Sequence, residues 1–270
     1  MPELPEMETY KRLLTEKIVN IPIKDVIIQR EKSINTDVRI IKDALIGGEI
    51  KSIERRAKHL VFRLRNKQSL LLHLMLGGWM YIGNEHDSPN RTKQITIIFN
   101  NGLQLFFIGL RLGYLHLLTD EQLGHELQNL GPEPLDSSFN IQLFSDIFNN
   151  KRGMLKTTLV NQEVISGIGN CYSDEIAYVA EVNPKKKINQ FNDIELNKLF
   201  NSIKSTLNRA IDLGGYMENP LYINDQLTGG YNEHCYVYDR EGKACFRCSD
   251  IIQKEIISSR KVFFCPTCQH

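Results

Sequence analysis

Four cysteines near the carboxyl end constrain the fold more than any other feature of this chain. Cys245, Cys248, Cys265 and Cys268 form the pattern C-x₂-C-x₁₆-C-x₂-C. Each C-x-x-C pair offers two thiolates to one ion, and the residues between the pairs can form a hairpin. Four sulfurs can then surround one Zn²⁺ tetrahedrally, and such an ion is structural because no coordination position stays open. The spacing therefore predicts a zinc ribbon over residues 235–270.

A redox dithiol is the alternative to this metal site, but two pairs at this spacing in one short polar tail favour the metal. So short a module cannot be held together by burial alone, and bound metal would supply its stability.

The composition is that of a globular protein, with 41% hydrophobic and 24% charged residues over 270 positions. This length suits two domains with a small appendage. The chain has no run of 18 apolar residues, and its acidic amino terminus lacks the apolar segment of a signal peptide. We therefore expect a cytoplasmic protein without a membrane partner, and we assume that it is a monomer because the sequence does not indicate an oligomeric state. Cys171 and Cys235 are then interpreted as free thiols, since cytosolic disulfides are rare.

Charge alone indicates no nucleic-acid partner, because 33 basic residues face 32 acidic ones. Any such partner must depend on local clusters. One cluster stands out: KSIERRAKHLVFRLRNK, residues 51–67, carries seven basic residues and one acidic residue.

Hydrophobic periodicity separates a β-rich half from a helical half. Residues 3–18 have apolar side chains at helical spacing, and the patterns up to about residue 120 are those of strands. Two β runs flank Asn101-Gly102, which predicts a hairpin. GPEPLD, residues 131–136, is interpreted as a linker. Three helical patterns follow, and then residues 216–234 form a loop of the length that often has a function.

A glycine turn joins two of the helical patterns. Gly167 and Gly169 permit unusual backbone angles, and Asn170 can cap the helix that follows. Free N–H groups at such a helix start suit a phosphate. Many turns of this kind need glycine for packing only, so both interpretations stay open at this point.

The amino terminus, MPELPEMETY, places Pro2 directly after the initiator and surrounds it with Glu3, Glu6 and Glu8. Proline and acidic residues suit the first turn of a helix, which is the structural interpretation.

These features occur in one order that resembles a known family. The stretches PELPEMET, RRAKHL, LGPEPL and SGIGNCYSDE, with the terminal ribbon, are similar to the bacterial formamidopyrimidine-DNA glycosylase family, relatives of endonuclease VIII. The resemblance implies an α+β fold: an amino-terminal β-sandwich with a flanking helix (1–133), a helix-two-turns-helix DNA-binding domain (137–234) and the zinc ribbon (235–270), with one structural Zn²⁺. It also implies a cytoplasmic, nucleoid-associated bacterial protein that binds damaged double-stranded DNA.

The resemblance gives the amino terminus a chemical role. Removal of Met1 would free the Pro2 amine. An α-amine has a pKa of about 8, so a fraction of the molecules has a neutral, nucleophilic amine at neutral pH. Attack on a sugar C1′ would give an iminium that promotes loss of the damaged base, then β- and δ-elimination. Glu3 would be the general acid or base, Glu6 would support the site through hydrogen bonds, and Lys58 would contact phosphate or the lesion.

Other matches imply a grip on the DNA. Lys156, Gly169 and Asn170 match residues that hold the backbone around the lesion, and Arg260 matches a ribbon arginine that pinches the duplex. The damaged base would be rotated out of the stack. The implied substrates are oxidised purines, formamidopyrimidine and 8-oxoguanine.

The chain departs from the family in the groups that fill the space left by that base. The aligned apolar wedge is Leu76. Relatives also insert an arginine and a phenylalanine from DPRRFG, where this chain has IGLRLGYL. Aligning Arg111 with the first arginine puts Gly113 at the phenylalanine, whereas a shift by one puts Leu112 there and leaves Leu110 at the arginine. Either way one inserted group is missing, and we expect Arg111 to contact the estranged base.

The lesion-facing residues after Gly214-Gly215 also differ, with YMENPLYINDQ in place of Ser/Thr-Thr-Leu. This combination predicts lyase activity on abasic sites more securely than excision of 8-oxoguanine. Two alternatives stay open: a non-catalytic or lyase-only paralogue that recognises abasic, distorted or branched DNA, and a zinc-ribbon protein that binds partners other than DNA.

Overall fold

The computed structural model describes residues 1–270 and divides into two compact units. The first unit combines Met1–Gln128 with Leu213–Gly230. The second combines Asn129–Asp212 with Tyr231–His270. The chain therefore leaves the first unit, returns to it once, and leaves it again.

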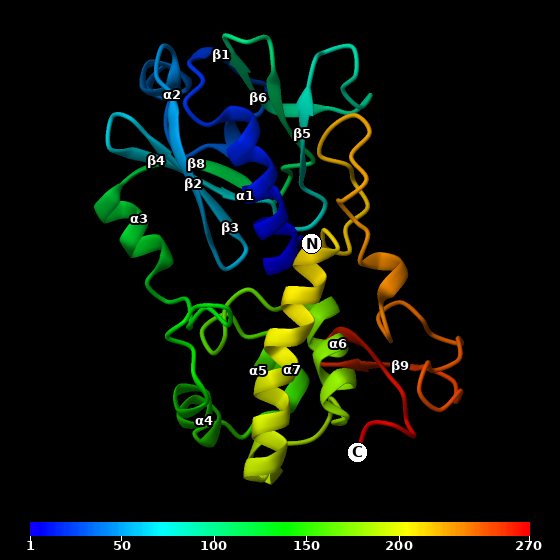
Figure 1. Ribbon diagram of the computed structural model, residues 1–270. Helices are drawn as coiled ribbons and strands as arrows, with labels where there is room; N and C mark the ends of the chain where they lie inside the picture. The colour runs from blue at the N-terminus through cyan, green and yellow to red at the C-terminus, as the bar shows by residue number, and fades with distance from the viewer. The chain divides into compact units, whose positions relative to one another are not determined.

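Two four-stranded antiparallel sheets form the first unit (Figure 1). Their core is apolar, and Phe62 meets Phe107 edge to face at 6.5 Å between ring centroids, one ring from each sheet. This is the predicted sandwich, and the predicted hairpin at Asn101-Gly102 joins two of its strands. One sheet has the order β1 (Ile23–Ile28), β6 (Lys93–Phe99), β7 (Gln104–Ile108) and β5 (Trp79–Gly83), and the other has the order β2 (Ile50–Arg56), β3 (His59–Leu64), β4 (Gln68–His73) and β8 (Tyr114–Thr119).

Helix α1 (Leu4–Ile18) packs against this sandwich and shares its core through Met7, Tyr10 and Leu14. The helix begins where the sequence predicts, because Glu3 and Glu6 form a capping box and proline occupies the first turn. The smaller helical segments of the unit are η1 (Glu31–Ser33), α2 (Val38–Leu45) and α3 (Asp120–Leu127).

The returning segment, Leu213–Gly230, has no helix or strand but is firmly attached to the first unit. The Leu221 side chain is buried in the sandwich core, and the Leu221 carbonyl accepts a hydrogen bond from Ile82 N at 2.7 Å. Asp225 accepts hydrogen bonds from the backbone N–H groups of Leu221, Leu227 and Thr228. The sequence places this segment in the helical domain, whereas its apolar anchor packs it with the sandwich.

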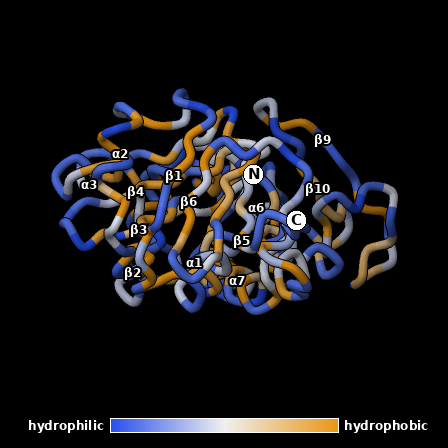
Figure 2. Tube along the Cα trace, turned by 90° about the horizontal axis from the view of Figure 1, so that it is seen from above, coloured by the Kyte–Doolittle hydropathy of each residue, from blue (hydrophilic) through white to orange (hydrophobic).

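The second unit is helical and ends in the ribbon. Its longest helix is α7, and α6 is almost entirely buried. In the ribbon, β9 pairs with β10 as an antiparallel hairpin, and β9 runs mostly through hydrophilic residues (Figure 2). The elements are α4 (Ile141–Asn149), α5 (Leu155–Leu159), α6 (Asn170–Ala180), η2 (Ile188–Gln190), α7 (Asp193–Asp212), η3 (Asn232–His234), β9 (Gln253–Ile257) and β10 (Arg260–Phe264).

Candidate active site and metal centre

A buried carboxylate organises the amino terminus. Glu6 has no exposed surface, and its two oxygens accept hydrogen bonds from two different segments. Glu3 N donates to Glu6 Oε2 at 2.7 Å, and Tyr216 N donates to Glu6 Oε1 at 2.8 Å. Pro2 and Glu3 are themselves buried beside it. We call Pro2, Glu3, Glu6 and Tyr216 the amino-terminal clamp, because one carboxylate joins the first helix to the returning segment.

Gly215 is required for this clamp. Its φ of +75° lies in the left-handed region, and a Cβ at this position would overlap Glu6 Oε1. The expected supporting role of Glu6 therefore has a definite geometry, although the sequence gives no indication that its partner is residue 216.

The Tyr216 side chain reaches the end of the chain. Its hydroxyl donates to the Met1 carbonyl oxygen at 3.1 Å, and the Met1 amino group lies 3.5 Å from the same hydroxyl. With Met1 in place, the Pro2 nitrogen belongs to a peptide bond, whose lone pair is delocalised. Any nucleophilic chemistry at Pro2 therefore requires removal of Met1.

Lys58 is buried at the turn between β2 and β3, with 5% of its surface exposed. Arg55 holds this turn against α1, because Arg55 Nε donates to Glu8 Oε2 at 2.9 Å and an Arg55 Nη donates to the Ala57 carbonyl at 3.2 Å. Burial raises the pKa of Glu8, but hydrogen bonds from Lys11 and Arg55 outweigh burial and hold that pKa below its usual value.

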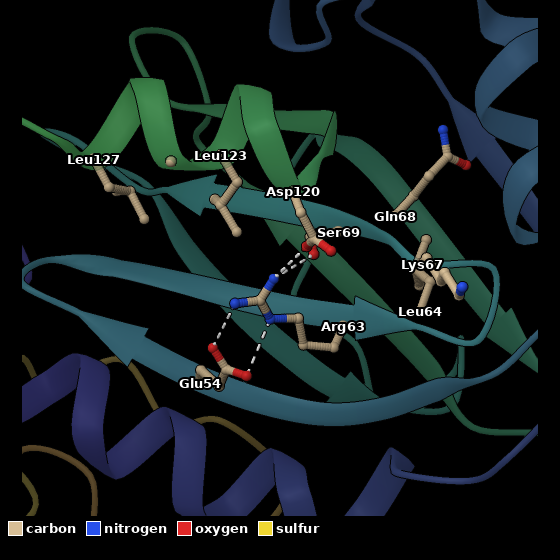
Figure 3. Close-up of a pocket in the computed structure, with 10 residues that line it drawn as sticks. Glu54, Arg63, Leu64, Lys67, Gln68, Ser69, Asp120, Leu123 and Leu127 are labelled. Carbon is tan, nitrogen blue, oxygen red and sulfur yellow. Dashed lines mark hydrogen bonds and ion pairs between the residues drawn. The ribbon is translucent and has the colours of Figure 1, made fainter.

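The basic stretch of residues 51–67 is mostly neutralised within the protein. Arg63 Nε and Nη2 each lie 3.0 Å from a Glu54 oxygen, and Nη1 donates to Asp120 at 2.9 Å and to Ser69 at 3.2 Å. Figure 3 shows these groups in a pocket of about 610 Å³ between β2, β3 and α3. Arg65 pairs with Glu49 at 2.7 Å. The cluster is therefore largely a set of ion pairs, and Lys58 is the member that remains of interest for the site.

A histidine that the sequence reasoning missed holds the wedge loop. His73 ends β4, and its Nδ1 accepts a hydrogen bond from Met75 N at 3.0 Å, where Met75 has a φ of +52°. Burial, together with the nearby charges of His59 and Lys58, lowers the pKa of His73 to about 3. The neutral ring is thus the form that supports the loop. The only sequence signal for His73 is its place directly before the wedge stretch.

Two loops meet at their backbones to present the wedge residues. A Cβ at Gly109 would overlap the Gly77 carbonyl oxygen, so glycine permits this contact. Leu76 and Leu112 are 68% and 64% exposed, whereas Leu110 is fully buried. Of the two alignments, exposure favours the one that puts Leu112 at the second apolar position, next to Arg111.

Leu76 borders a cavity of about 740 Å³. Arg111 also lines this cavity, which supports the expectation that it faces a ligand. Trp79 and Asn219 add a ring and an amide to the lining, and Asn219 comes from the returning segment. The residues that differ from the family therefore border the same space. We call Leu76, Arg111 and Leu112 the loop tips.

In the second unit, Asn170 is exposed at the first residue of α6, and Gly169 occupies the N-cap position. Asn170 is thus not the cap that the sequence indicates. Its exposed place at a helix start still suits contact with a phosphate.

Lys156 is fully buried. Its Nζ lies 2.7 Å from Asp174 Oδ1 and donates to the Asn170 carbonyl at 2.8 Å, while Asp174 Oδ2 accepts from Phe263 N at 3.0 Å. Burial raises the pKa of Asp174 to about 7, and the Lys156 charge opposes that rise. Lys156 thus holds the start of α6 and, through Asp174, strand β10. The expected contact of Lys156 with DNA is not available to a side chain without exposed surface.

Glu175, the next residue, was also missed. It is fully buried and accepts hydrogen bonds from the backbone N–H groups of Tyr236, Val237 and Tyr238 and from the Tyr231 hydroxyl. These four donors fix the chain where it enters the ribbon.

The ribbon carries four cysteines that are placed to hold one metal ion. The four cysteine sulfurs lie within 4.8 Å of one another, with 3.9 Å between Cys245 and Cys268 and 3.5 Å between Cys248 and Cys265. Tetrahedral zinc with sulfur ligands at about 2.3 Å would space the sulfurs about 3.8 Å apart, so the donor set fits this ion. Arg260 is exposed at the start of β10, at the tip of the ribbon hairpin.

Three family descriptions match consecutive parts of the chain. They are the formamidopyrimidine-DNA glycosylase N-terminal domain over residues 1–114, the H2TH domain of the same glycosylase over 130–219, and a zinc finger found in FPG and IleRS over 242–270. None of the helices combines the length and apolar character needed to cross a membrane.

Curated relatives match end to end. Formamidopyrimidine-DNA glycosylase of Pelotomaculum thermopropionicum is 31% identical over 273 residues, covering 100% of this chain and 99% of that protein. The Listeria innocua protein of the same name is 32% identical over 274 residues, covering 100% of both.

Solved structures agree. Lactococcus lactis Fpg with abasic-site DNA has a TM-score of 0.91 and 31% identity over 99% of both chains. MutM with DNA containing carbocyclic 8-oxo-G has a TM-score of 0.90 and 31% identity over 100% of both chains. The sandwich, the helical unit and the four-cysteine ribbon define the class of DNA repair glycosylases with a zinc finger. Within that class, the chain belongs to the formamidopyrimidine-DNA glycosylase family.

Proposed function

We propose that this protein is a bifunctional DNA glycosylase and abasic-site lyase that removes oxidised purines from double-stranded DNA through the nitrogen of Pro2. The observation that carries the proposal is the amino-terminal clamp, in which the Glu6 carboxylate holds Glu3 and Tyr216 around a buried Pro2. A helix start needs only the Glu3–Glu6 contact, and not the contact from Tyr216 or the burial of Pro2. The proposed form is a monomer that acts in the cytoplasm, at the nucleoid.

The chemistry follows from a secondary amine. The lone pair of the freed Pro2 nitrogen attacks C1′, and the bond from C1′ to the damaged base breaks with its electron pair leaving on the base. Loss of the N–H proton and opening of the sugar ring give an iminium, which has no further N–H to lose and stays cationic. That cation withdraws electrons and permits β- and then δ-elimination of the flanking phosphates. The Glu3 carboxylate is the group placed to move protons at the sugar.

The exposed residues would bind the DNA. Leu76 and Leu112 are apolar tips that can enter the base stack, and Arg111 lies beside Leu112 to face the unpaired base. Asn170 and Arg260 are exposed and suit phosphates. Lys58 is the buried cation next to His73 that would meet phosphate or the lesion. Lys156 contributes indirectly, by fixing the turn that carries Asn170.

The metal is proposed to be Zn²⁺, held by Cys245, Cys248, Cys265 and Cys268. It would supply no reaction chemistry, since four thiolates leave no open position. Its contribution would be to fold the hairpin that presents Arg260.

Borohydride trapping tests the proposal. Protein lacking Met1 is incubated with duplexes that carry an abasic site, formamidopyrimidine or 8-oxoguanine, and reduction should fix a protein–DNA adduct. A lack of adduct with every duplex would rule the lyase out. The altered segment Tyr216–Gln226 favours one second candidate, a lyase-only protein, which would trap abasic DNA but leave both damaged bases in place.

A further inference from the structure

Tyr216 is the residue through which the altered segment touches the proposed nucleophile. The side chain is half-buried, and the backbone N–H is fixed by Glu6. The hydroxyl lies 3.1 Å from the Met1 carbonyl oxygen, an atom two covalent bonds from the Pro2 nitrogen. Removal of Met1 takes away that carbonyl and leaves the hydroxyl facing the freed nitrogen.

We propose that Tyr216 is a positioning residue for the Pro2 nitrogen, with its phenolic oxygen accepting the N–H of the freed amine. This inference rests on the proposed function. A neutral secondary amine has one N–H and one lone pair, so a hydrogen bond that fixes the N–H also fixes where the lone pair points. A phenolic oxygen can accept as well as donate, so the group that donates to Met1 in the full chain can accept from Pro2 afterwards.

The length of the side chain matters. The backbone of residue 216 is held beside Glu6, and a Ser or Thr hydroxyl, one bond beyond Cβ, would stay there. The aromatic ring carries the hydroxyl from that fixed backbone to the end of the chain. The substitution of tyrosine for the short residues expected at this position thus brings a hydrogen-bonding group to the nucleophile.

The hydrogen bond also affects protonation. The protonated amine is the stronger donor, so an acceptor next to it stabilises that form and raises the pKa of the Pro2 nitrogen. Tyr216→Phe should therefore lower this pKa and, at a pH where the amine is neutral, slow its attack because the lone pair is no longer oriented.

The experiment uses protein lacking Met1 and compares Tyr216→Phe with Tyr222→Phe. Tyr222 is a matched control on the same segment, and its ring lies under the Lys17 ammonium. Two quantities are measured: the rate of borohydride trapping on an abasic duplex as a function of pH, and the Pro2 pKa from ¹⁵N-proline NMR without DNA. We expect Tyr216→Phe to slow trapping by about three- to tenfold at high pH and to lower the pKa by about half a unit, as one hydrogen bond allows. Tyr222→Phe should match the parent protein in both.

Equal rates and an equal pKa in Tyr216→Phe and the parent, while the parent still traps DNA, would overturn the role of Tyr216 and leave the proposed function intact. A parent protein that traps no DNA would instead overturn the proposed function. In that case, a Pro2 pKa that is equal in Tyr216→Phe and the parent would also exclude the hydrogen bond. A lower Pro2 pKa in Tyr216→Phe would support the hydrogen bond without a catalytic consequence.

Discussion

The amino-terminal clamp and the loop tips belong to the same unit but are stabilised in opposite ways. The clamp is buried, and its carboxylate has hydrogen-bond donors within the protein. The tips, Leu76 and Leu112, are exposed and rest on a backbone contact between Gly77 and Gly109. Pro2, Glu3 and Glu6 of the clamp match the family in sequence, whereas Tyr216 and the tips depart from it. The clamp thus consists of groups held by contacts within the protein around the proposed nucleophile. The tips are groups whose proposed partner, the DNA, lies outside the protein.

The second unit repeats this division. Lys156 is buried and holds a turn, while Asn170 and Arg260 are exposed. Substitutions at the buried positions should therefore affect chemistry or folding, and substitutions at the exposed ones should affect the interaction with DNA and leave stability unchanged.

The largest effect is expected for Glu3→Gln, a substitution in the buried clamp. The amide keeps the size of the side chain but cannot take up a proton, so base release should slow by about 10²- to 10⁴-fold. Single-turnover cleavage of a formamidopyrimidine duplex measures the rate, and filter binding measures affinity. A loss of affinity equal to the loss of rate would show that Glu3 binds DNA and does not act on protons.

Lys156→Met should have the next largest effect, because it leaves the Asp174 carboxylate buried without its cation. The free energy of unfolding should fall by about 3–5 kcal/mol. Urea denaturation measures this loss. Arg260→Ala is the exposed counterpart, and its unfolding free energy should change by less than about 0.5 kcal/mol. If Arg260→Ala destabilised the protein as much as Lys156→Met, the distinction between buried residues that stabilise the fold and exposed residues that contact DNA would be wrong for the second unit.

Leu112→Ala tests the tips. Loss of an apolar tip should reduce the rate of base release about tenfold, because the extruded state of the DNA is less well supported. The melting temperature should stay the same, since the side chain is mostly exposed. Leu110→Ala is the matched buried control and should lower the melting temperature. Full activity in Leu112→Ala would contradict its role as a tip.

A pH dependence is expected at His73, whose buried ring accepts a hydrogen bond from the loop that carries Leu76. Its folded-state pKa of about 3 lies below the usual 6.5, so the unfolded chain binds the extra proton first. This contribution to stability is therefore complete above about pH 6.5 and is lost progressively as pH falls toward 3. His73→Asn keeps a hydrogen-bond acceptor and should flatten the stability profile between these values. An unchanged profile would mean that His73 does not titrate as its burial requires.

Sequence patterns predicted the fold class, the hairpin, the first helix and the metal ligands, because each has a local spacing that one physical cause explains. Cys245 and Cys248, for example, can share an ion wherever the rest of the chain lies. The contacts of Glu6 with Tyr216 could not be predicted, because 210 residues separate the partners and the returning segment has no periodic pattern.

Burial of charged residues escaped prediction for a similar reason. Lys156 has the sequence context of a surface lysine, and its burial depends on Asp174, which lies 18 residues away. The choice between the two alignments of Arg111 stays a prediction. Exposure favours the alignment that puts Leu112 at the apolar position, because Gly113 in the other alignment has no side chain to insert. Sequence thus indicated which groups belong to the site, and the structure showed which of them face outward.

The most direct test is to locate the bond between protein and DNA. Protein lacking Met1 is trapped on an abasic duplex with borohydride, digested, and examined by mass spectrometry. The deoxyribose fragment should be attached to the Pro2 nitrogen of the amino-terminal peptide, and protein that retains Met1 should give no adduct. A fragment attached to Lys58, or an adduct formed with Met1 in place, would contradict the proposed chemistry.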